Sequence, residues 1–230
     1  IACYGAVVRK IDGLIGDCAR VVADDAEEMG WFDLTTLKEP YRVEGKKTVG
    51  LELAEQFGWS LPDVIFFPTG GGVCLIAMWK AFHELQEIGW LKGPLPRMVA
   101  VQSTGCGPIA RSFESGKNEV EPWENVTTGI HGVRVPNPLG GKLVLDVLYE
   151  SNGLGTLVDD DEVDEMRARI SAEEGLHLCP EGAACLVALE IERTTGRVGP
   201  GDRVVVFNTA SGHKYPMPKP QNLNKDLKVD

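Results

Sequence analysis

A fully apolar run that leads into three consecutive glycines limits the folds open to this chain more than any other stretch of its sequence. The segment reads Val64-Ile-Phe-Phe-Pro-Thr-Gly-Gly-Gly-Val-Cys74, and helical periodicity follows it over 73–88. Glycine permits a positive φ and a close approach of the backbone to a ligand. A helix N-terminus adds unpaired N–H groups and the positive end of the helix dipole. The pattern predicts a phosphate site, although a tight turn without a ligand has the same residues.

The rest of the chain alternates short apolar runs with segments of helical periodicity. Strands are predicted over 6–11, 64–67, 98–102 and 203–208. Helices are predicted over 17–29, 45–57, 73–88, 108–114, 139–150, 161–174 and 181–195, with a long loop over 117–138. Apolar strands that alternate with helices predict an α/β fold, in which a mostly parallel twisted sheet has helices on both faces.

Charge and composition exclude several classes of protein. Lys and Arg number 23 against 34 Asp and Glu, a formal net charge of −11, so neither nucleic acid nor an anionic membrane surface is an expected partner. No apolar run approaches the roughly 20 residues of a membrane-spanning helix, and no signal peptide opens the chain. The chain has six cysteines, too few for a disulfide scaffold, so we expect free thiols and a cytoplasmic location. No CxxC pair occurs among them, which disfavours zinc-ribbon and thioredoxin-like chemistry; they are Cys3, Cys18, Cys74, Cys106, Cys179 and Cys185.

Other motifs point less clearly to chemistry. The acidic run 159–165 reads as a solvated helix N-terminus, and no metal site is expected because EF-hand spacing is absent. Gly45-Lys-Lys-Thr48 resembles the end of a P-loop but lacks its upstream glycine, and no GxGxxG occurs. A hydrolase pair of Ser211 and His213 is disfavoured, since residues two apart rarely give triad geometry and no GxSxG is present.

The predicted strand 203–208 delivers small polar residues, among them Asn208 and Thr209, to its C-terminal end, where ligands bind in open α/β sheets. Together with the glycine segment, this end of the chain resembles the threonine synthase family. The resemblance is carried by Pro68-Thr-Gly-Gly-Gly72, Ala77-Met-Trp-Lys-Ala-Phe82 and Asn208-Thr-Ala-Ser-Gly-His-Lys-Tyr215, with support from 12–20, 39–48 and 179–184. It runs in order from about Tyr4 to Pro216, although each motif alone is shared with sister enzymes.

This family contains pyridoxal-phosphate enzymes of the tryptophan-synthase-β fold, also called fold type II. The resemblance implies that 1–31 is the end of a small domain, 32–215 a large cofactor-binding domain and 216–230 a tail. It implies that the backbone amides of five consecutive residues hold the cofactor phosphate, namely Gly70, Gly71, Gly72, Val73 and Cys74. It also implies that the hydroxyl of Thr209 faces the pyridine nitrogen, and that 129–138 lies near the substrate.

The implied reaction converts O-phospho-L-homoserine and water to L-threonine and phosphate through a pyridoxal-phosphate aldimine. The family's Schiff-base lysine lies upstream of Tyr4, and no lysine here stands in its motif. No catalytic residue is therefore expected in this chain, which looks like a fragment without its N-terminal part. The alternatives are a sister ammonia-lyase acting on threonine, serine or diaminopropionate, and a non-catalytic phosphate-binding scaffold. The expected partner is a small amino-acid substrate, and the resemblance is compatible with a homodimer.

Overall fold

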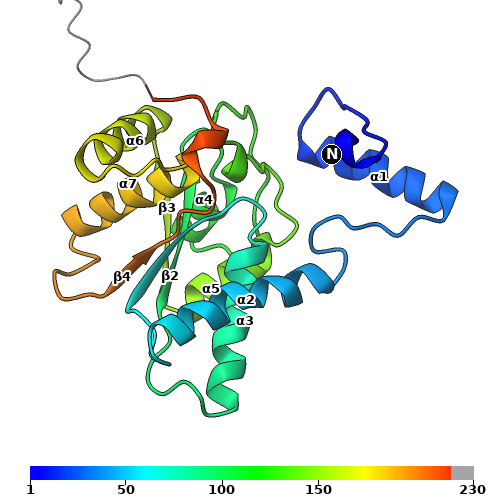
Figure 1. Ribbon diagram of the computed structural model, residues 1–230. Coiled ribbons are helices and arrows are strands. Elements are labelled where there is room, and N and C mark those ends of the chain that lie inside the picture. The colour runs from blue at the N-terminus through cyan, green and yellow to red at the C-terminus, as the bar shows by residue number, and fades with distance from the viewer. Residues whose placement is uncertain (219–230) are drawn as a thin grey trace, which may run out of the picture.

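Four parallel strands form the centre of the computed structural model, in which residues 1–218 are described (Figure 1). They are β1 (Val64–Pro68), β2 (Arg97–Ser103), β3 (Leu154–Val158) and β4 (Val204–Val206), in the spatial order β3-β2-β1-β4. Every neighbouring pair is parallel, and Val64 is in register with Arg97 on one side and Val204 on the other. The strands therefore end at one common edge, which receives both the glycine turn after β1 and the residues after β4.

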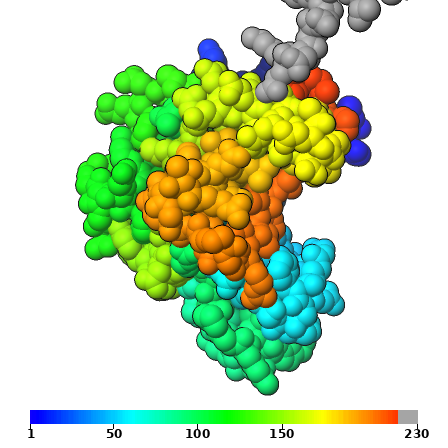
Figure 2. All heavy atoms as spheres, turned by 90° about the vertical axis from the view of Figure 1, so that its left-hand side faces the viewer, coloured from blue at the N-terminus to red at the C-terminus, as the bar shows by residue number. Residues whose placement is uncertain are grey.

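Helices cover both faces of this sheet, which confirms the predicted α/β class. One face packs against α2 (Tyr41–Gln56), α3 (Val73–Glu87) and α5 (Gly141–Glu150), with α4 (Pro108–Glu114) beside β2 and β3. The other face packs against α6 (Asp160–Glu174) and α7 (Pro180–Thr194), and Figure 2 shows this side of the molecule. The remaining helices are α1 (Ile15–Met29) and three short 3₁₀ turns, Ala2–Tyr4, His131–Val133 and Gly212–Lys214.

The alternation of side chains along β1 divides the buried core into two layers. Ile65 and Phe67 point toward the layer that contains Met78 and Phe82 of α3. Phe66 points to the opposite layer, among the apolar residues of α6 and α7. Both faces of β1 are thus covered, as a central parallel strand requires, and its end is held firmly at the edge where the glycines begin.

The predicted helix 45–57 begins earlier, at Tyr41, the predicted strand 203–208 is shorter, and two further elements differ in kind. Residues 6–11 form no strand, and Val7 is 91% exposed, because no neighbouring strand within residues 1–218 pairs with this segment. In contrast, β3 was not predicted, because Gly153 and Gly155 interrupt a short apolar run that reads as a turn. Of the predicted tail 216–230, residues 219–230 lie outside the described residues.

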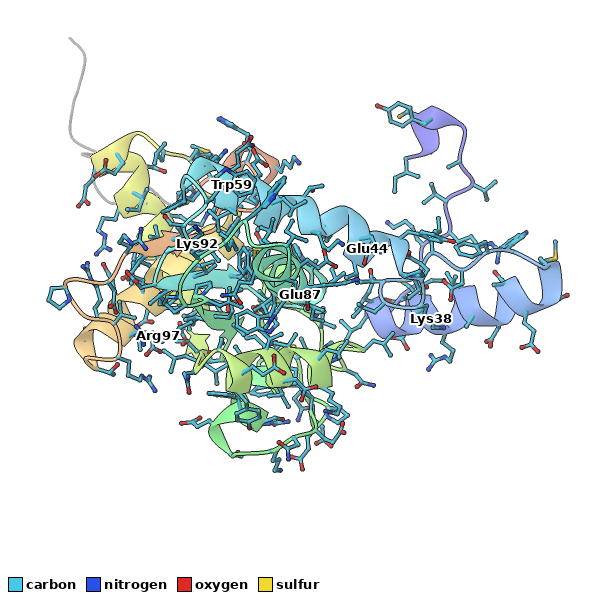
Figure 3. The ribbon with its side chains drawn as sticks, turned by 90° about the horizontal axis from the view of Figure 1, so that it is seen from below. Lys38, Glu44, Trp59, Glu87, Lys92 and Arg97 are labelled. Atoms are coloured by element: carbon cyan, nitrogen blue, oxygen red, sulfur yellow. The ribbon has the colours of Figure 1, made fainter. Side chains whose placement is uncertain are left out.

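The first 31 residues lie apart from the layered core (Figures 1 and 3). No residue of α1 is buried, although the helix carries apolar side chains. The boundary at 31/32 between two domains stays a prediction. All six cysteines are free, and Cys106, Cys179 and Cys185 are buried, whereas Cys3 is exposed and does not pack as a core residue. Within residues 1–218 no helix has both the length and the apolar composition needed to cross a membrane, and no cluster of potential metal ligands is found there.

Candidate cofactor site

A cavity of about 500 Å³ opens at the edge of the sheet where the parallel strands end. The five residues of the glycine turn and Thr209 all line it, so the structure brings together the six predicted site residues from two separate parts of the chain. The remaining lining residues are Lys46, Val49, Phe67, Pro68, Gly132, Glu181, Phe207 and Tyr215. Gly132 belongs to the segment 129–138, which was expected near the substrate.

The three glycines of the turn are required for different reasons. A Cβ at Gly70 would overlap the carbonyl oxygen of Gly132. Gly72 is the N-cap of α3 with φ +85°, and a Cβ there would overlap the side chain of Val144. A Cβ at Gly71 would meet no atom within 4 Å. Close packing explains why positions 70 and 72 require glycine. At Gly71 no neighbouring atom requires it, and the missing side chain leaves open space beside the turn.

The turn also presents unused hydrogen-bond donors. The first helical hydrogen bond of α3 runs from the amide of Ile76 to the carbonyl of Gly72, at 3.0 Å. Among residues 1–218, the amides of Gly71, Gly72, Val73 and Cys74 donate to no protein acceptor. Four amide donors and the positive end of the helix dipole therefore point to an anion as the ligand of this turn.

Buried polar contacts fix the position of the turn relative to β2. The side chain of Gln102, which is fully buried, donates from Nε2 to the carbonyl of Thr69 at 3.0 Å. Its Oε1 accepts hydrogen bonds from the amides of Ile109 and Ala110 at 2.9 and 3.0 Å, in the first turn of α4. Thr69 in turn donates from its amide to the carbonyl of Val101 at 2.9 Å. Thr69, the residue before the first glycine, thus makes two hydrogen bonds with β2, and Gln102 connects it to the start of α4.

On the opposite side of the cavity, the end of β4 is joined to the start of α7. The amide of Cys179 donates to Oδ1 of Asn208 at 3.1 Å, and the Asn208 amide group donates to the carbonyl of Ala210 at 2.9 Å. The sulfur of Cys179 lies 4.0 Å from the hydroxyl oxygen of Thr209. Thr209 is itself exposed, so its hydroxyl is available to a ligand in the cavity.

Glu181 is a cavity residue that the sequence reasoning missed. Its side chain is 4% exposed, and its Oε1 accepts a hydrogen bond from the amide of Gly132 at 2.8 Å. Its Oε2 is buried without a partner among the described residues. Burial, and then the neighbouring Glu181 carboxylate, raise the pKa of Tyr215 to about 12, so this phenol is protonated at neutral pH. An acidic residue directly after Pro180, in the otherwise apolar first half of a helix, was the signal available for Glu181.

These features fit a small phosphorylated molecule with polar groups on its ring. The free amides around Gly71 suit the phosphate, and the open space at Gly71 gives it room. The hydroxyl of Thr209 is a polar group available to the remainder of the ligand, and Glu181 adds a buried carboxylate to the lining. The residues present are thus compatible with pyridoxal phosphate.

Comparisons with known proteins agree with this geometry. Residues 1–210 match the family described as "Pyridoxal-phosphate dependent enzyme". A threonine synthase of Methanocaldococcus jannaschii is 29% identical over 227 residues, covering 99% of this chain and 56% of the relative. A threonine synthase of Methanosarcina acetivorans is 31% identical over 210 residues, covering 91% of this chain and 51% of the relative. The chain thus spans about half the length of these relatives.

A solved structure of the processed form of threonine deaminase isoform 2 from Solanum lycopersicum superimposes with a TM-score of 0.64. It is 19% identical, and the match covers 82% of this chain and 51% of that one. At this identity the similarity is evidence for the fold alone, which is that of the fold-type II enzymes. The family match extends over most of the sequence and includes the whole glycine turn and Thr209. The chain therefore belongs to the family of pyridoxal-phosphate dependent enzymes.

Proposed function

We propose that this chain is the cofactor-binding part of a threonine synthase, which converts O-phospho-L-homoserine and water to L-threonine and phosphate. The observation that carries the proposal is one cavity lined both by the glycine turn, with its four free amides, and by Thr209. The names of the two relatives support the choice of this reaction among those of the family. No lysine of this chain stands in the family's Schiff-base motif.

Bound pyridoxal phosphate would supply an electron sink for bond breaking at the amino-acid substrate. In the proposal, the turn over 70–74 binds the phosphate through backbone donors. Thr209 offers the ring nitrogen a neutral hydroxyl. Since a neutral hydroxyl stabilises a positive charge on the ring less than a carboxylate does, the ring stays a weaker electron sink, which favours elimination and replacement. Tyr215, whose pKa is about 12, remains a neutral hydrogen-bond donor in the same cavity.

A sister ammonia-lyase is the second candidate, because a threonine deaminase has the same fold. Such an enzyme would need the same phosphate turn and the same ring contact, so the site described above fits both reactions. The two candidates differ in the product that they release, which is phosphate for a threonine synthase and ammonia for an ammonia-lyase.

One assay separates these candidates. The purified product of the complete gene is incubated with O-phospho-L-homoserine, and separately with threonine, serine and diaminopropionate. Phosphate and ammonia are then both measured. We expect phosphate release from O-phospho-L-homoserine together with formation of threonine. Ammonia release from the other amino acids, without phosphate release, would replace the proposal by the lyase. Release of neither product would favour a non-catalytic binding protein.

A further inference from the structure

Lys46, in the first half of α2, brings a positive charge to the cavity. No other lysine or arginine is among the described residues that line the cavity, and Lys46 is half-buried. Within residues 1–218 no carboxylate lies within ion-pair distance of its ammonium group, although the chain has 34 acidic residues. The adjacent Lys47 behaves differently, since its ammonium group pairs with Glu44 at 2.6 Å and with Glu84 at 2.7 Å.

The packing of α2 on α3 sets Lys46 beside the glycine turn. Gly50 of α2 lies against α3, and a Cβ at Gly50 would be 3.2 Å from the Cα of Met78. One helical turn earlier on each helix are Lys46 and Cys74. Burial raises the pKa of the Cys74 thiol, and the positive charge of Lys46 partly offsets that rise, in accord with their proximity.

This position is unfavourable for a cation unless an anion is bound there. The N-terminus of α3 carries the positive end of the helix dipole, which repels an ammonium group. The four free amides of the turn add further positive partial charge around the same space. A phosphate dianion between the amides and the ammonium group would turn these repulsions into charge-assisted hydrogen bonds.

We propose that Lys46 binds the phosphate group of the cofactor, together with the backbone amides of the glycine turn. The inference rests on the proposed cofactor site, and it assigns the cation that balances the phosphate in a chain whose net charge is −11. Through this contact, α2 would take part in binding the cofactor.

The test compares two probes that cannot react covalently with lysine, pyridoxine 5′-phosphate and pyridoxine. Both are titrated against the 230-residue chain by isothermal calorimetry. The ratio of their dissociation constants isolates the contribution of the phosphate. We expect Lys46→Gln to lower this ratio about tenfold, as loss of one charge-assisted contact implies. Lys46→Arg, which keeps the charge, should lower it less than threefold. Lys92→Gln is the matched control, because Lys92 follows the opposite end of α3 (Figure 3).

The outcomes separate this inference from the function on which it rests. An unchanged ratio in a folded Lys46→Gln chain, with clear phosphate preference in the wild type, would overturn the role of Lys46 and leave the cofactor site standing. Equal weakening of both probes would make Lys46 a packing residue and also overturn its role. A wild-type chain that does not prefer the phosphorylated probe would overturn both the site and the inference. Thermal unfolding of each variant checks that it is folded.

Discussion

Gly71 differs from its two neighbours because its missing side chain leaves open space instead of preventing a clash. Its φ is not positive either, so an ordinary residue fits the backbone there. We expect Gly71→Asp to fold but to lose pyridoxal phosphate, with affinity reduced more than tenfold, because its carboxylate would enter the space of a phosphate dianion where water screens charge poorly. Cofactor retained after dialysis is the measurement, with circular dichroism as the check on folding.

Gly201→Asp is the control for this substitution, since Gly201 also has open space around it and no positive φ. It lies in the loop before β4 and should keep the cofactor. A folded Gly71→Asp protein that retains as much cofactor as this control would mean that the phosphate is bound elsewhere.

The exposed hydroxyl of Thr209 leads to a second prediction at this scale. In the complete enzyme, Thr209→Ala should keep cofactor affinity within about tenfold, because one neutral hydrogen bond contributes roughly 0.5–1.5 kcal/mol. Turnover should fall further than affinity, since the contact acts on the ring. Thr194→Ala, at the far end of α7, is the control. Turnover equal to that of the control would contradict a role of the Thr209 hydroxyl at the cofactor ring.

Tyr215 gives a prediction for pH dependence. Its pKa is raised from 10.0 to about 12 in the folded chain, by burial and by the Glu181 carboxylate. The protonated phenol is therefore favoured by folding, so this contribution to stability is complete below pH 10 and is lost as pH rises through about 12. Absorbance at the phenolate band should show one tyrosine titrating near pH 12 that is absent from Tyr215→Phe. Identical titration curves for the two proteins would contradict this assignment.

At the scale of the elements, Gln102 connects β2, α4 and the start of the glycine turn. Gln102→Leu removes one donor and one acceptor, and leaves the amides of Ile109 and Ala110 and the carbonyl of Thr69 buried without partners. We expect a loss of about 2–4 kcal/mol in the free energy of unfolding, measured with urea. Gln56→Leu, at the exposed end of α2, should change stability by less than about 0.5 kcal/mol. Equal stability of the two variants would show that other groups satisfy these amides.

The elements also show which parts of the fold can be predicted from sequence. The unit formed by β1, the turn and α3 was predictable, because apolar content, glycines and helical periodicity all agree there. The strand expected over 6–11 has the right residues but no neighbour to pair with among residues 1–218. For β3 the opposite holds, because pairing with β2 makes a strand of a segment that contains Gly155. Strand pairing is a property of the whole sheet, so local sequence does not determine it.

At the scale of the molecule, the cavity joins residues that are far apart in the sequence. The phosphate turn was predictable because its donors are backbone groups of consecutive residues, which a local motif reveals. Lys46, Glu181 and Tyr215 come from well-separated segments, and only the packing of α2, α7 and the chain after β4 brings them to one cavity. The charge balance of the site is therefore a tertiary property, because no single motif in the sequence contains all three residues.

That charge balance leads to a prediction for the chain as a whole. When the 230-residue chain is mixed with pyridoxal phosphate, reduced with borohydride and mapped by mass spectrometry, we expect partial labelling scattered over exposed lysines such as Lys92 and Lys142. No lysine of the chain stands in the family's Schiff-base motif. Lys46 should not label stoichiometrically, because we place its ammonium group at the phosphate of the cofactor and not at its aldehyde. Labelling of any single lysine at one group per chain would contradict this prediction, and at Lys46 it would place the covalent cofactor link within this chain.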